Sequence, residues 1–312
     1  MGKKKTVFFS KLAASGIYDN ASVVYSLRRP DMAGGTLWTN AVLKIRRGFD
    51  SATVFVFFDG SAIDDTITLN SLISTTSNTT PDATTLSTWI TGAGSENVFV
   101  EEWIGITPNN IIDANKTVSQ AAGNTQPQFM ESGVIKVNAD NGLIALDCLT
   151  GRFFEGTANS DLDYGESFGI LSVSNNTLGG NNRVVWSNRA ARVNGVDLFN
   201  SRKTSSTKQL ARIITDDGSF EVLKLVTSNT DEVKLFSMTV HSSTIKGYFN
   251  GASQGTTAFT NTYPNVTSRV GVGPIFDGIF YGMIQEVILM KGDITADLTA
   301  LHAEINAYYS IY

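Results

Sequence analysis

The chain has 312 residues, of which 42% are hydrophobic and 17% charged, with a formal net charge of −5. This composition is typical of a globular protein with a large core and argues against extensive disorder. Apart from Lys3, Lys4 and Lys5 there is no basic region for nucleic acid, and a single cysteine, Cys148, excludes an internal disulfide framework.

The first 17 residues read MGKKKTVFFSKLAASGI and superficially resemble a secretory leader. A leader needs an unbroken apolar stretch of about 7–15 residues. Here Val7–Phe9 is followed at once by Ser10 and Lys11, so we expect no signal peptide. No run reaches the roughly 18 apolar residues of a membrane span. We expect an N-terminal arm, residues 1–17, followed by one domain, residues 18–312.

Short apolar segments separated by Asn, Gly, Ser and Thr turns predict an all-β sandwich or barrel. The segment TVFVFFDG predicts a strand from Thr53. Apolar residues at 69, 72 and 73 and at 86, 89 and 90 fit two short helical turns around a threonine-rich loop. Another strand is predicted from Phe168 to Val173.

The segment KLFSMTVHSSTIKGYFNG predicts a meander. Phe236, Met238 and Val240 alternate with polar residues, as in a strand with one buried face. A turn at Ser242–Ser243 follows, and Asn250–Gly251 is a pair suited to the positive φ angles of a two-residue hairpin turn.

The end of the chain predicts a central strand and then a helix. YGMIQEVILM is nearly continuous in apolar residues, which favours a strand covered on both faces. Asp293 or Thr295 is expected to cap the helix that follows. The residues expected on its buried face are Leu298, Leu301, Ile305, Tyr308 and Tyr312.

Several segments resemble a module of bacteriophage virion proteins that is related to arabinofuranosidase-B-type domains. They are Tyr25–Arg29 (YSLRR), Ile45–Asp50 (IRRGFD), Trp103, Gln126–Gln128, NGLIALDCLTGRFFEG and the ending Glu304–Tyr312 (EINAYYSIY). The resemblance covers roughly residues 18–312. It implies a concanavalin A-like, laminin-G-type jelly-roll sandwich with short peripheral helices and a C-terminal helix.

The chain departs from this family at two loops that are acidic in its relatives. WIGITPNN stands where the family has a WYDQSGNG-like turn, and LDCLTGR replaces an FDGxDD-like segment, leaving Asp147 alone. Both changes remove carboxylates, which weakens any transfer of enzymatic or calcium-dependent function from the family.

Catalysis on a sugar would need two carboxyl groups about 5–9.5 Å apart, and no motif identifies such a pair. The candidate acids are Asp59, Asp64, Asp65, Glu101, Glu102, Asp161, Asp163, Glu166, Asp216 and Asp217. Most are adjacent pairs in predicted loops, where turn formation and solubility explain them. The best local cluster for calcium is DLDYGE (Asp161, Asp163, Glu166), and a solvated acidic loop is the explanation we favour for it. We expect no metal and no cofactor.

Sugar binding requires aromatic faces beside polar side chains. Trp38, Trp89, Trp103, Trp186, Tyr164 and Tyr281 are the aromatic candidates, although tryptophans commonly belong to the core. The predicted ligand-binding residues are Trp186, Asn188, Arg189, Asp161, Asp163 and Tyr164. Arg189 and Arg192 would alternatively serve a subunit contact.

These observations predict a virion surface protein, such as a spike, fibre head or decoration subunit, that recognises a host-cell glycan and is not an enzyme. Its partners would be other virion proteins, the glycan and further copies of itself, with a trimer favoured. It would be assembled in the host cytoplasm, with residues 1–17 anchoring it to the particle. The alternatives are a glycoside hydrolase acting on arabinan-like or capsular polysaccharide, and a capsid or coat subunit without a ligand.

Overall fold

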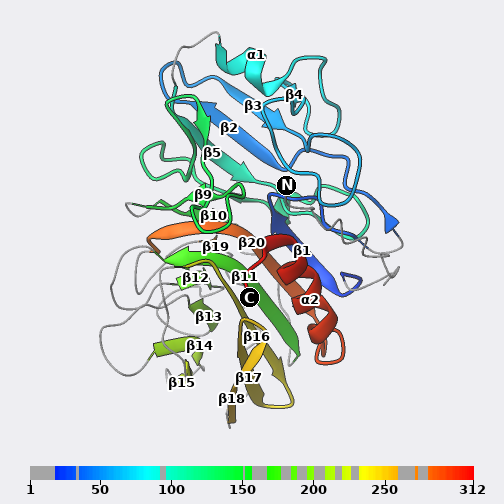
Figure 1. Ribbon diagram of the computed structural model, residues 1–312, viewed down its shortest axis with the longest axis vertical. Helices are drawn as coiled ribbons and strands as arrows, with labels where there is room; N and C mark the ends of the chain where they lie inside the picture. Colours follow the sequence, from blue (N-terminus) through cyan, green and yellow to red (C-terminus); the bar gives the residue numbers. More distant parts are fainter. Residues whose placement is uncertain are drawn as a thin grey trace, which may run out of the picture.

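A computed structural model describes residues 18–32, 35–91, 96–149, 152–156, 167–176, 184–187, 195–199, 208–214, 220–225, 232–258, 271–272 and 280–312. The described residues form an all-β structure with few helices (Figure 1). The expected arm, residues 1–17, lies outside the described part, so its role and the domain boundary stay predictions.

The strands fall into two groups along the chain. Those before residue 160 are β1 (Ala21–Ser26), β2 (Leu43–Arg47), β3 (Thr53–Val56), β4 (Ile73–Ser74), β5 (Val98–Trp103), β6 (Val118–Ser119), β7 (Gln128–Glu131), β8 (Val134–Ile135), β9 (Leu146–Asp147) and β10 (Phe154–Gly156). Those after it are β11 (Phe168–Asn176), β12 (Val184–Ser187), β13 (Gly195–Phe199), β14 (Lys208–Ile214), β15 (Phe220–Leu225), β16 (Lys234–His241), β17 (Thr244–Phe249), β18 (Ala252–Ala258), β19 (Gly271–Val272) and β20 (Gly282–Lys291).

One layer of the sandwich is antiparallel, in the order β1–β20–β11–β16–β17–β18. Its central strand β11 pairs with β20 on one side, where Leu171 lies opposite Ile288, and with β16 on the other. Nearly every residue of β20 is buried. The continuous apolar run of YGMIQEVILM therefore forms a strand covered on both faces, as predicted.

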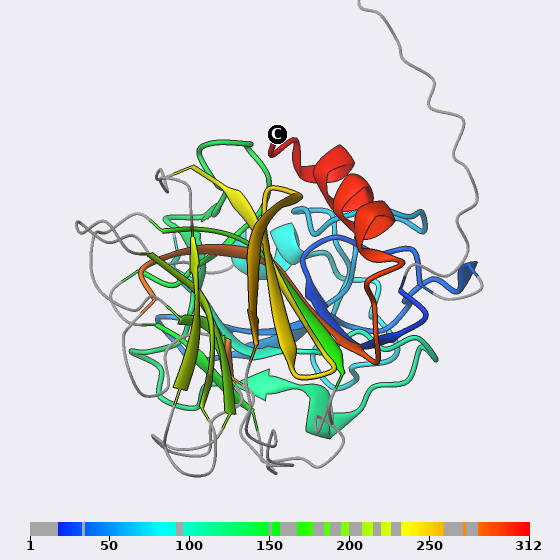
Figure 2. The ribbon, with the colours of Figure 1, turned by 90° about the horizontal axis from the view of Figure 1, so that it is seen from below.

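The second series of paired strands runs β4–β3–β2–β5–β6–β10–β19–β12–β13–β14–β15. Through β7 and β9 it is joined to β20, so the hydrogen-bonded network is continuous. The far end of this series lies against the first layer, because β13 contacts β16 and β15 contacts β17 and β18. In Figure 2 the yellow-green strands β13–β15 lie beside the yellow strands β16–β18.

The predicted meander is confirmed. Ser242 and Ser243 turn the chain between β16 and β17 with φ angles of 48° and 57°. Asn250 and Gly251 turn it between β17 and β18 with φ angles of 49° and 75°, in the region that favours Asn and Gly. Unlike a strand with one buried face, β16 is buried at every position but its last, His241.

The two predicted helical turns around the threonine-rich loop have different outcomes. The second is confirmed as α1 (Leu86–Thr91), which buries Leu86 and Ile90. The first is wrong: Ile73 lies in the short strand β4 and pairs with Val56 of β3. A two-residue strand is too short for its own spacing to distinguish it from a helical turn. A short 3-10 helix (Ala114–Lys116) follows β5.

The predicted C-terminal helix is α2 (Leu298–Tyr309), and its first residue follows Asp297 rather than Asp293 or Thr295. The Asp293 carboxylate instead accepts hydrogen bonds from the backbone and hydroxyl of Thr295, which form a turn ahead of the helix. None of the helices in the described ranges is long and apolar enough to cross a membrane.

The buried face of α2 differs from the prediction at its end. Leu298, Leu301 and Ile305 are buried as expected, together with His302 and Tyr309, whereas Tyr308 is only partly buried and Tyr312 is 54% exposed. Tyr309 follows Ile305 by four residues and so continues the same face. Tyr312 leaves that face because the helix ends at Ser310, whose φ of 53° is left-handed.

Candidate functional site

Trp186, around which the sequence predicts a ligand site, lies in β12 with its side chain fully buried. The other predicted ligand-binding residues, Asn188, Arg189, Asp161, Asp163 and Tyr164, lie outside the described residues. That cluster therefore stays a prediction. Burial of Trp186 agrees with the alternative that tryptophans in this chain belong to the core.

The same holds for two of the other three tryptophans. Trp38 and Trp103 are buried, and Trp89 on α1 is partly exposed. The guanidinium of Arg47 lies 4.7 Å from the centre of the Trp89 ring and 5.4 Å from that of Phe49, which is 61% exposed. Phe49 and Trp89 therefore form an exposed aromatic surface around Arg47.

The described candidate carboxylates all have protein partners. Asp59 accepts a hydrogen bond from Thr68. Asp64 pairs with Arg28 at 2.9 Å and Asp65 with Arg29 at 3.2 Å, while Glu101 and Glu102 share Lys44 at 2.9 and 3.2 Å. Asp161, Asp163, Glu166, Asp216 and Asp217 lie outside the described residues.

Glu102 is the candidate acid that borders a hollow, one of about 230 Å³. Asn78, Thr117 and Ser119 are its other polar lining residues, and the apolar ones are Ile104, Ile112 and Ala114. Among the described residues that line this hollow there is no second carboxylate. The two-carboxylate arrangement of a glycosidase is therefore not formed at this place.

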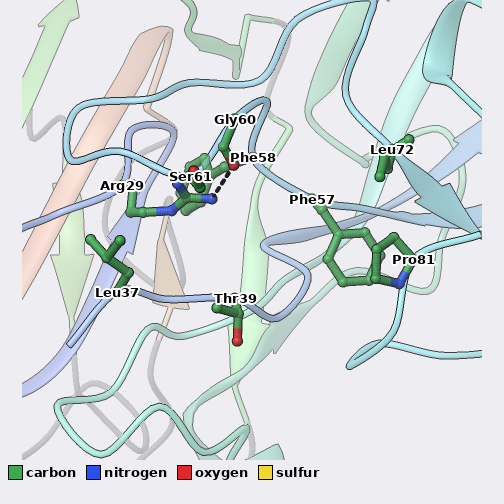
Figure 3. A pocket seen from close by; sticks show the side chains of 9 residues that line it. All are labelled: Arg29, Leu37, Thr39, Phe57, Phe58, Gly60, Ser61, Leu72 and Pro81. Atoms are coloured by element: carbon green, nitrogen blue, oxygen red, sulfur yellow. Dashed lines mark hydrogen bonds between the residues drawn. The ribbon is translucent and has the colours of Figure 1, made fainter.

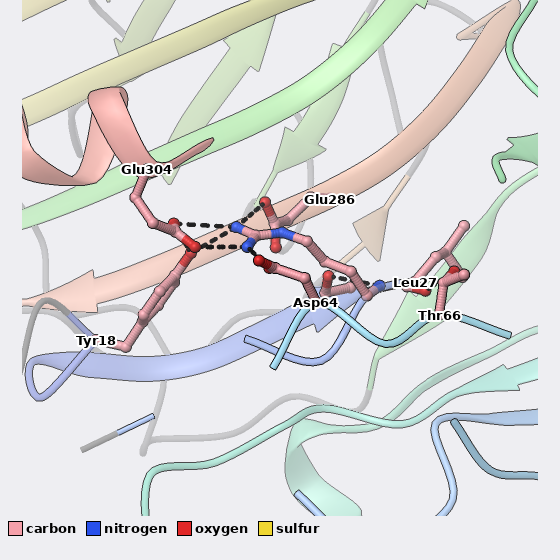
Figure 4. Close-up of polar contacts among 8 residues, drawn as sticks. Tyr18, Leu27, Asp64, Thr66, Glu286 and Glu304 are labelled. Carbon is pink, nitrogen blue, oxygen red and sulfur yellow. Dashed lines mark hydrogen bonds and ion pairs between the residues drawn. The ribbon is translucent and has the colours of Figure 1, made fainter. Parts of the chain in front are cut away.

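A cluster of ion pairs surrounds Arg28, which follows β1. Its guanidinium, fully buried, contacts Glu286 of β20 at 3.3 Å, Asp64 at 2.9 Å and Glu304 of α2 (Figure 4). Tyr18 accepts a hydrogen bond from Arg28 at 2.8 Å and donates one to Glu304 at 2.6 Å. One cation thus joins the first strand, the last strand, the Asp64 loop and the C-terminal helix.

This cluster has more carboxylates than cations, and that excess affects Glu286. Burial raises the pKa of Glu286 from 4.5 to about 6, against the opposing effect of Arg28, and the nearby Glu304 raises it further. Because Glu286 and Arg28 are completely covered, neither side chain can reach a substrate. The cluster holds the fold together and is not a catalytic pair.

A small hollow lies on the opposite side of the same loop. Its volume is about 170 Å³, and it is lined by Arg29, Leu37, Thr39, Phe57, Phe58, Gly60, Ser61, Leu72 and Pro81. Figure 3 shows Arg29 at one end, with its guanidinium bonded to the carbonyl of Gly60 at 3.0 Å. Arg29 also donates to the Ala62 carbonyl and is neutralised by Asp65.

The Arg29 hollow has limited capacity for a ligand. Its volume of about 170 Å³ lies below the roughly 300–1,000 Å³ that is usual for ligand sites. Phe57 and Phe58 are only 4% and 5% exposed, so little of either ring is accessible to a ligand. This hollow suits a small apolar group and is too small for an oligosaccharide.

A larger groove, of about 650 Å³, lies between α2 and the turn that joins β17 to β18. In Figure 2 the helix lies beside this end of the hairpin. Its lining residues are Asn250, Gly251, Ala252, Thr299, His302, Ala303, Asn306, Ala307 and Tyr312. The volume falls within the range of about 300–1,000 Å³ that is usual for ligand sites.

The side chains that line the groove are uncharged, and small apolar ones lie beside amide and hydroxyl groups. Burial lowers the pKa of His302 to about 4, so its ring is neutral at physiological pH. His302 shares a hydrogen bond of 2.7 Å with Ser237 and contacts the edge of the Tyr248 ring. No side chain among those that line the groove in the described structure therefore carries a formal charge at neutral pH.

Sequence reasoning missed this groove. The sequence assigns Asn250–Gly251 only a turn, and it places Tyr312 on the buried face of α2. The groove forms because the β17–β18 turn lies near α2, about 50 residues further along the chain. A local sequence pattern does not predict which distant segments come together. No group of His, Cys, Asp and Glu suited to a metal ion occurs within the described ranges.

No protein-family model matches the chain, and no curated protein is significantly similar to it in sequence. Among solved structures, a GH54 α-L-arabinofuranosidase soaked with a cyclic sulfate inhibitor has a TM-score of 0.60 at 13% identity. An arabinofuranosidase complexed with arabinofuranosyl-α-1,2-xylobiose has a TM-score of 0.58, also at 13% identity. Each similarity covers 94% of this chain but only 64% of the enzyme.

These similarities show the fold alone, because the sequence identity is far below 25%. They confirm the jelly-roll β-sandwich, with its peripheral helices and C-terminal helix, that the sequence predicts. A domain of an extracellular arabinanase from Geobacillus stearothermophilus, in complex with arabinotriose, is also similar, but its TM-score of 0.40 is too low to support an argument.

Proposed function

We propose that this protein is a non-catalytic carbohydrate-binding protein. Its fold is the one on which arabinofuranosidases are built. The observation that carries the proposal is the state of the described candidate acids, each of which is held by a cation or a hydroxyl group. Glu102, which borders a hollow, is paired with Lys44, and no second carboxylate lines that hollow among the described residues. Sugar binding without cleavage needs no such pair.

The setting we propose is the surface of a bacteriophage particle, where the protein would recognise a host-cell glycan as part of a spike, fibre head or decoration subunit. This part of the proposal rests on the sequence resemblance of Tyr25–Arg29 and Glu304–Tyr312 to phage virion proteins. We propose further that residues 1–17 attach the protein to other virion proteins and that it acts as a homo-oligomer, with a trimer favoured. Assembly would take place in the host cytoplasm.

The competing function is glycoside hydrolysis. Incubation of the full chain with arabinan and with bacterial capsular polysaccharides separates the two. We expect polysaccharide to be retained by the immobilised protein, with release of reducing ends at the level of a protein-free blank. Clear release of reducing ends by the parent chain would overturn the non-catalytic proposal, and no retention of any polysaccharide would favour a coat subunit without a ligand.

The virion setting has its own test. Mass spectrometry of gradient-purified phage particles, followed by antibody labelling in electron micrographs, should place the protein on the particle surface. A chain that begins near residue 18 should fold with an unchanged melting transition and be missing from particles. Normal incorporation of this shortened chain would refute the anchoring role of residues 1–17.

A further inference from the structure

The groove between α2 and the β17–β18 turn has the features of a saccharide site. The residues that line it include the small residues Gly251, Ala303 and Ala307, and the ring of Tyr312 packs over Gly251. Its rim carries hydroxyl and amide groups. Tyr312 lies across one end and is 54% exposed.

Three rim groups are available for hydrogen bonding. The side-chain carbonyl of Asn250 accepts from the backbone of Leu235, and within the described structure its NH2 group has no protein partner. Thr299 is exposed, and its hydroxyl has no partner among the described residues. The hydroxyl of Tyr312 makes only a long bond, 3.4 Å, to the carbonyl of His302. Amide and hydroxyl groups of this kind match the hydroxyls of a sugar.

Hydrogen bonds from α2 fix the backbone of the residues that follow the helix. Asn306 accepts hydrogen bonds from the backbones of Ile311 and Tyr312, both at 2.9 Å, and so fixes the residues after α2. Asn306 also donates to the carbonyl of Tyr312 at 2.8 Å. Because the backbone at Tyr312 is held in place, less conformational entropy is lost when a ligand stacks on its ring.

The absence of formal charge on the described lining side chains indicates the class of ligand. An anionic sugar would be desolvated here without a cation to pair with it, which costs free energy. A neutral sugar meets polar partners and an aromatic ring whose face is apolar and whose hydroxyl is polar. We propose that this groove binds a neutral saccharide of two or three sugar units, with Tyr312 stacking on a ring and Asn250 and Thr299 binding its hydroxyls.

This inference rests on the proposed carbohydrate-binding function, and it locates the sugar-binding site in the groove between α2 and the β17–β18 turn. It is tested with the full chain and four trisaccharide probes: maltotriose, cellotriose and arabinotriose, which are neutral, and trigalacturonic acid, which is anionic. Isothermal titration calorimetry gives the dissociation constants. We expect at least one neutral probe to bind and the anionic probe to bind at least tenfold more weakly.

The variants separate the groove from other surfaces. Tyr312→Ala removes the stacking ring, and Ala303→Trp fills the groove from an exposed position. Each should weaken binding at least tenfold. Thr299→Val should weaken it about fivefold, as expected for the loss of one hydrogen bond. Asn250→Asp keeps an oxygen that accepts from Leu235 but replaces the NH2 donor with a charged carboxylate oxygen, and it should weaken binding of the neutral probe.

Two matched controls accompany these variants. Thr256→Val makes the same change as Thr299→Val at an exposed position of β18, outside the groove. Phe49→Ala removes an exposed aromatic ring that contacts Arg47, as Trp89 of α1 does, and α1 lies far from α2 (Figure 1). Both should leave the dissociation constant unchanged. Melting curves of all variants show whether each is folded.

The outcomes separate this inference from the function on which it rests. Binding by the parent chain that is unchanged in Tyr312→Ala and Ala303→Trp would overturn the groove assignment and leave the carbohydrate-binding function in place. Loss of binding in Phe49→Ala alone would move the site to the α1 surface. Tighter binding of trigalacturonic acid than of the neutral probes would overturn the ligand class. No binding of any polysaccharide or probe by the parent would overturn both proposals.

Discussion

Arg28 and Glu304 form an ion pair although 276 residues separate them in the chain. Arg28 belongs to the YSLRR segment and Glu304 to the EINAYYSIY ending, which are two of the segments on which the proposed virion setting rests. The guanidinium also lies 4.9 Å and 5.5 Å from the ring centres of Tyr308 and Tyr309 in the same ending. The two segments are therefore halves of one structural contact, by which the C-terminal helix is attached to the sandwich.

Removing the cation at the centre of this contact should destabilise the protein severely. In Arg28→Met, the buried Glu286 and the partly buried Glu304 lose their common partner. Breaking a buried ion pair from one side typically costs about 3–5 kcal/mol. Urea unfolding should show this loss. Lys116→Gln, which removes a solvent-accessible pair with Asp113, is the control and should cost at most about 1 kcal/mol. Equal effects of the two changes would contradict a structural role for Arg28.

Glu286 should make stability depend on pH between about 4.5 and 6. Its pKa is about 6 in the folded protein against an ordinary 4.5, so the folded state binds more protons in that window. Stability therefore falls as pH rises through the window. Measured against Glu286→Gln, the parent should lose about 1 kcal/mol of unfolding free energy between pH 4.5 and 6, out of a total of about 2 kcal/mol over the whole titration. A constant difference between the two proteins across this range would refute the raised pKa.

His302 should act in the opposite direction. Its pKa is about 4 in the folded protein against an ordinary 6.5, so the unfolded state binds more protons between these values. Stability contributed by the neutral ring is complete above pH 6.5 and is lost as pH falls toward 4. Measured against His302→Gln, the parent should lose up to about 3 kcal/mol on acidification from pH 6.5 to 4. The measurement is urea unfolding at half-unit steps of pH.

The packing of α2 should contribute a large share of the stability. Ile305 is completely buried against the core, and its truncation to Ala is expected to cost about 2–5 kcal/mol. Thr299→Ala, at an exposed position of the same helix, is the matched control and should change the unfolding free energy little. Deletion of residues 301–312 should abolish the cooperative melt or cause aggregation. If the deletion mutant melts like the parent and only changes its mass in light scattering, the segment serves an oligomer contact instead.

Gly251 should be more sensitive to substitution than Gly142, which also has a positive φ. A Cβ at this position would lie 2.6 Å from the hydroxyl of Tyr312, and its φ is +75°. Gly142 has a φ of +68° but nothing within 4 Å of its Cβ position. Gly142→Ala therefore measures the backbone strain alone, about 1–2 kcal/mol, and Gly251→Ala should cost more. In a Tyr312→Ala background the two substitutions should become equal. An unchanged difference would show that Tyr312 does not cause it.

The amino-acid sequence by itself determined the features that depend on neighbours in the chain. Alternation and turn residues identified the β16–β17–β18 meander and the Asn250–Gly251 turn, because strand faces and positive φ angles are set within a few residues. Spacing identified α2 but not its first residue, since Asp293 formed a local turn with Thr295 before the helix. The resemblance to known modules identified the sandwich.

The tertiary structure alone decided which residues are covered and which meet. Trp38, Trp103 and Trp186 are buried while Trp89 is partly exposed, and nothing in their immediate sequence separates them. Arg28 forms ion pairs with Glu286 and Glu304 only because β1, β20 and α2 pack together. The groove likewise exists because the ending of α2 is held beside Gly251. Burial and contact between distant segments depend on how whole elements pack, and local patterns contain no information about that packing.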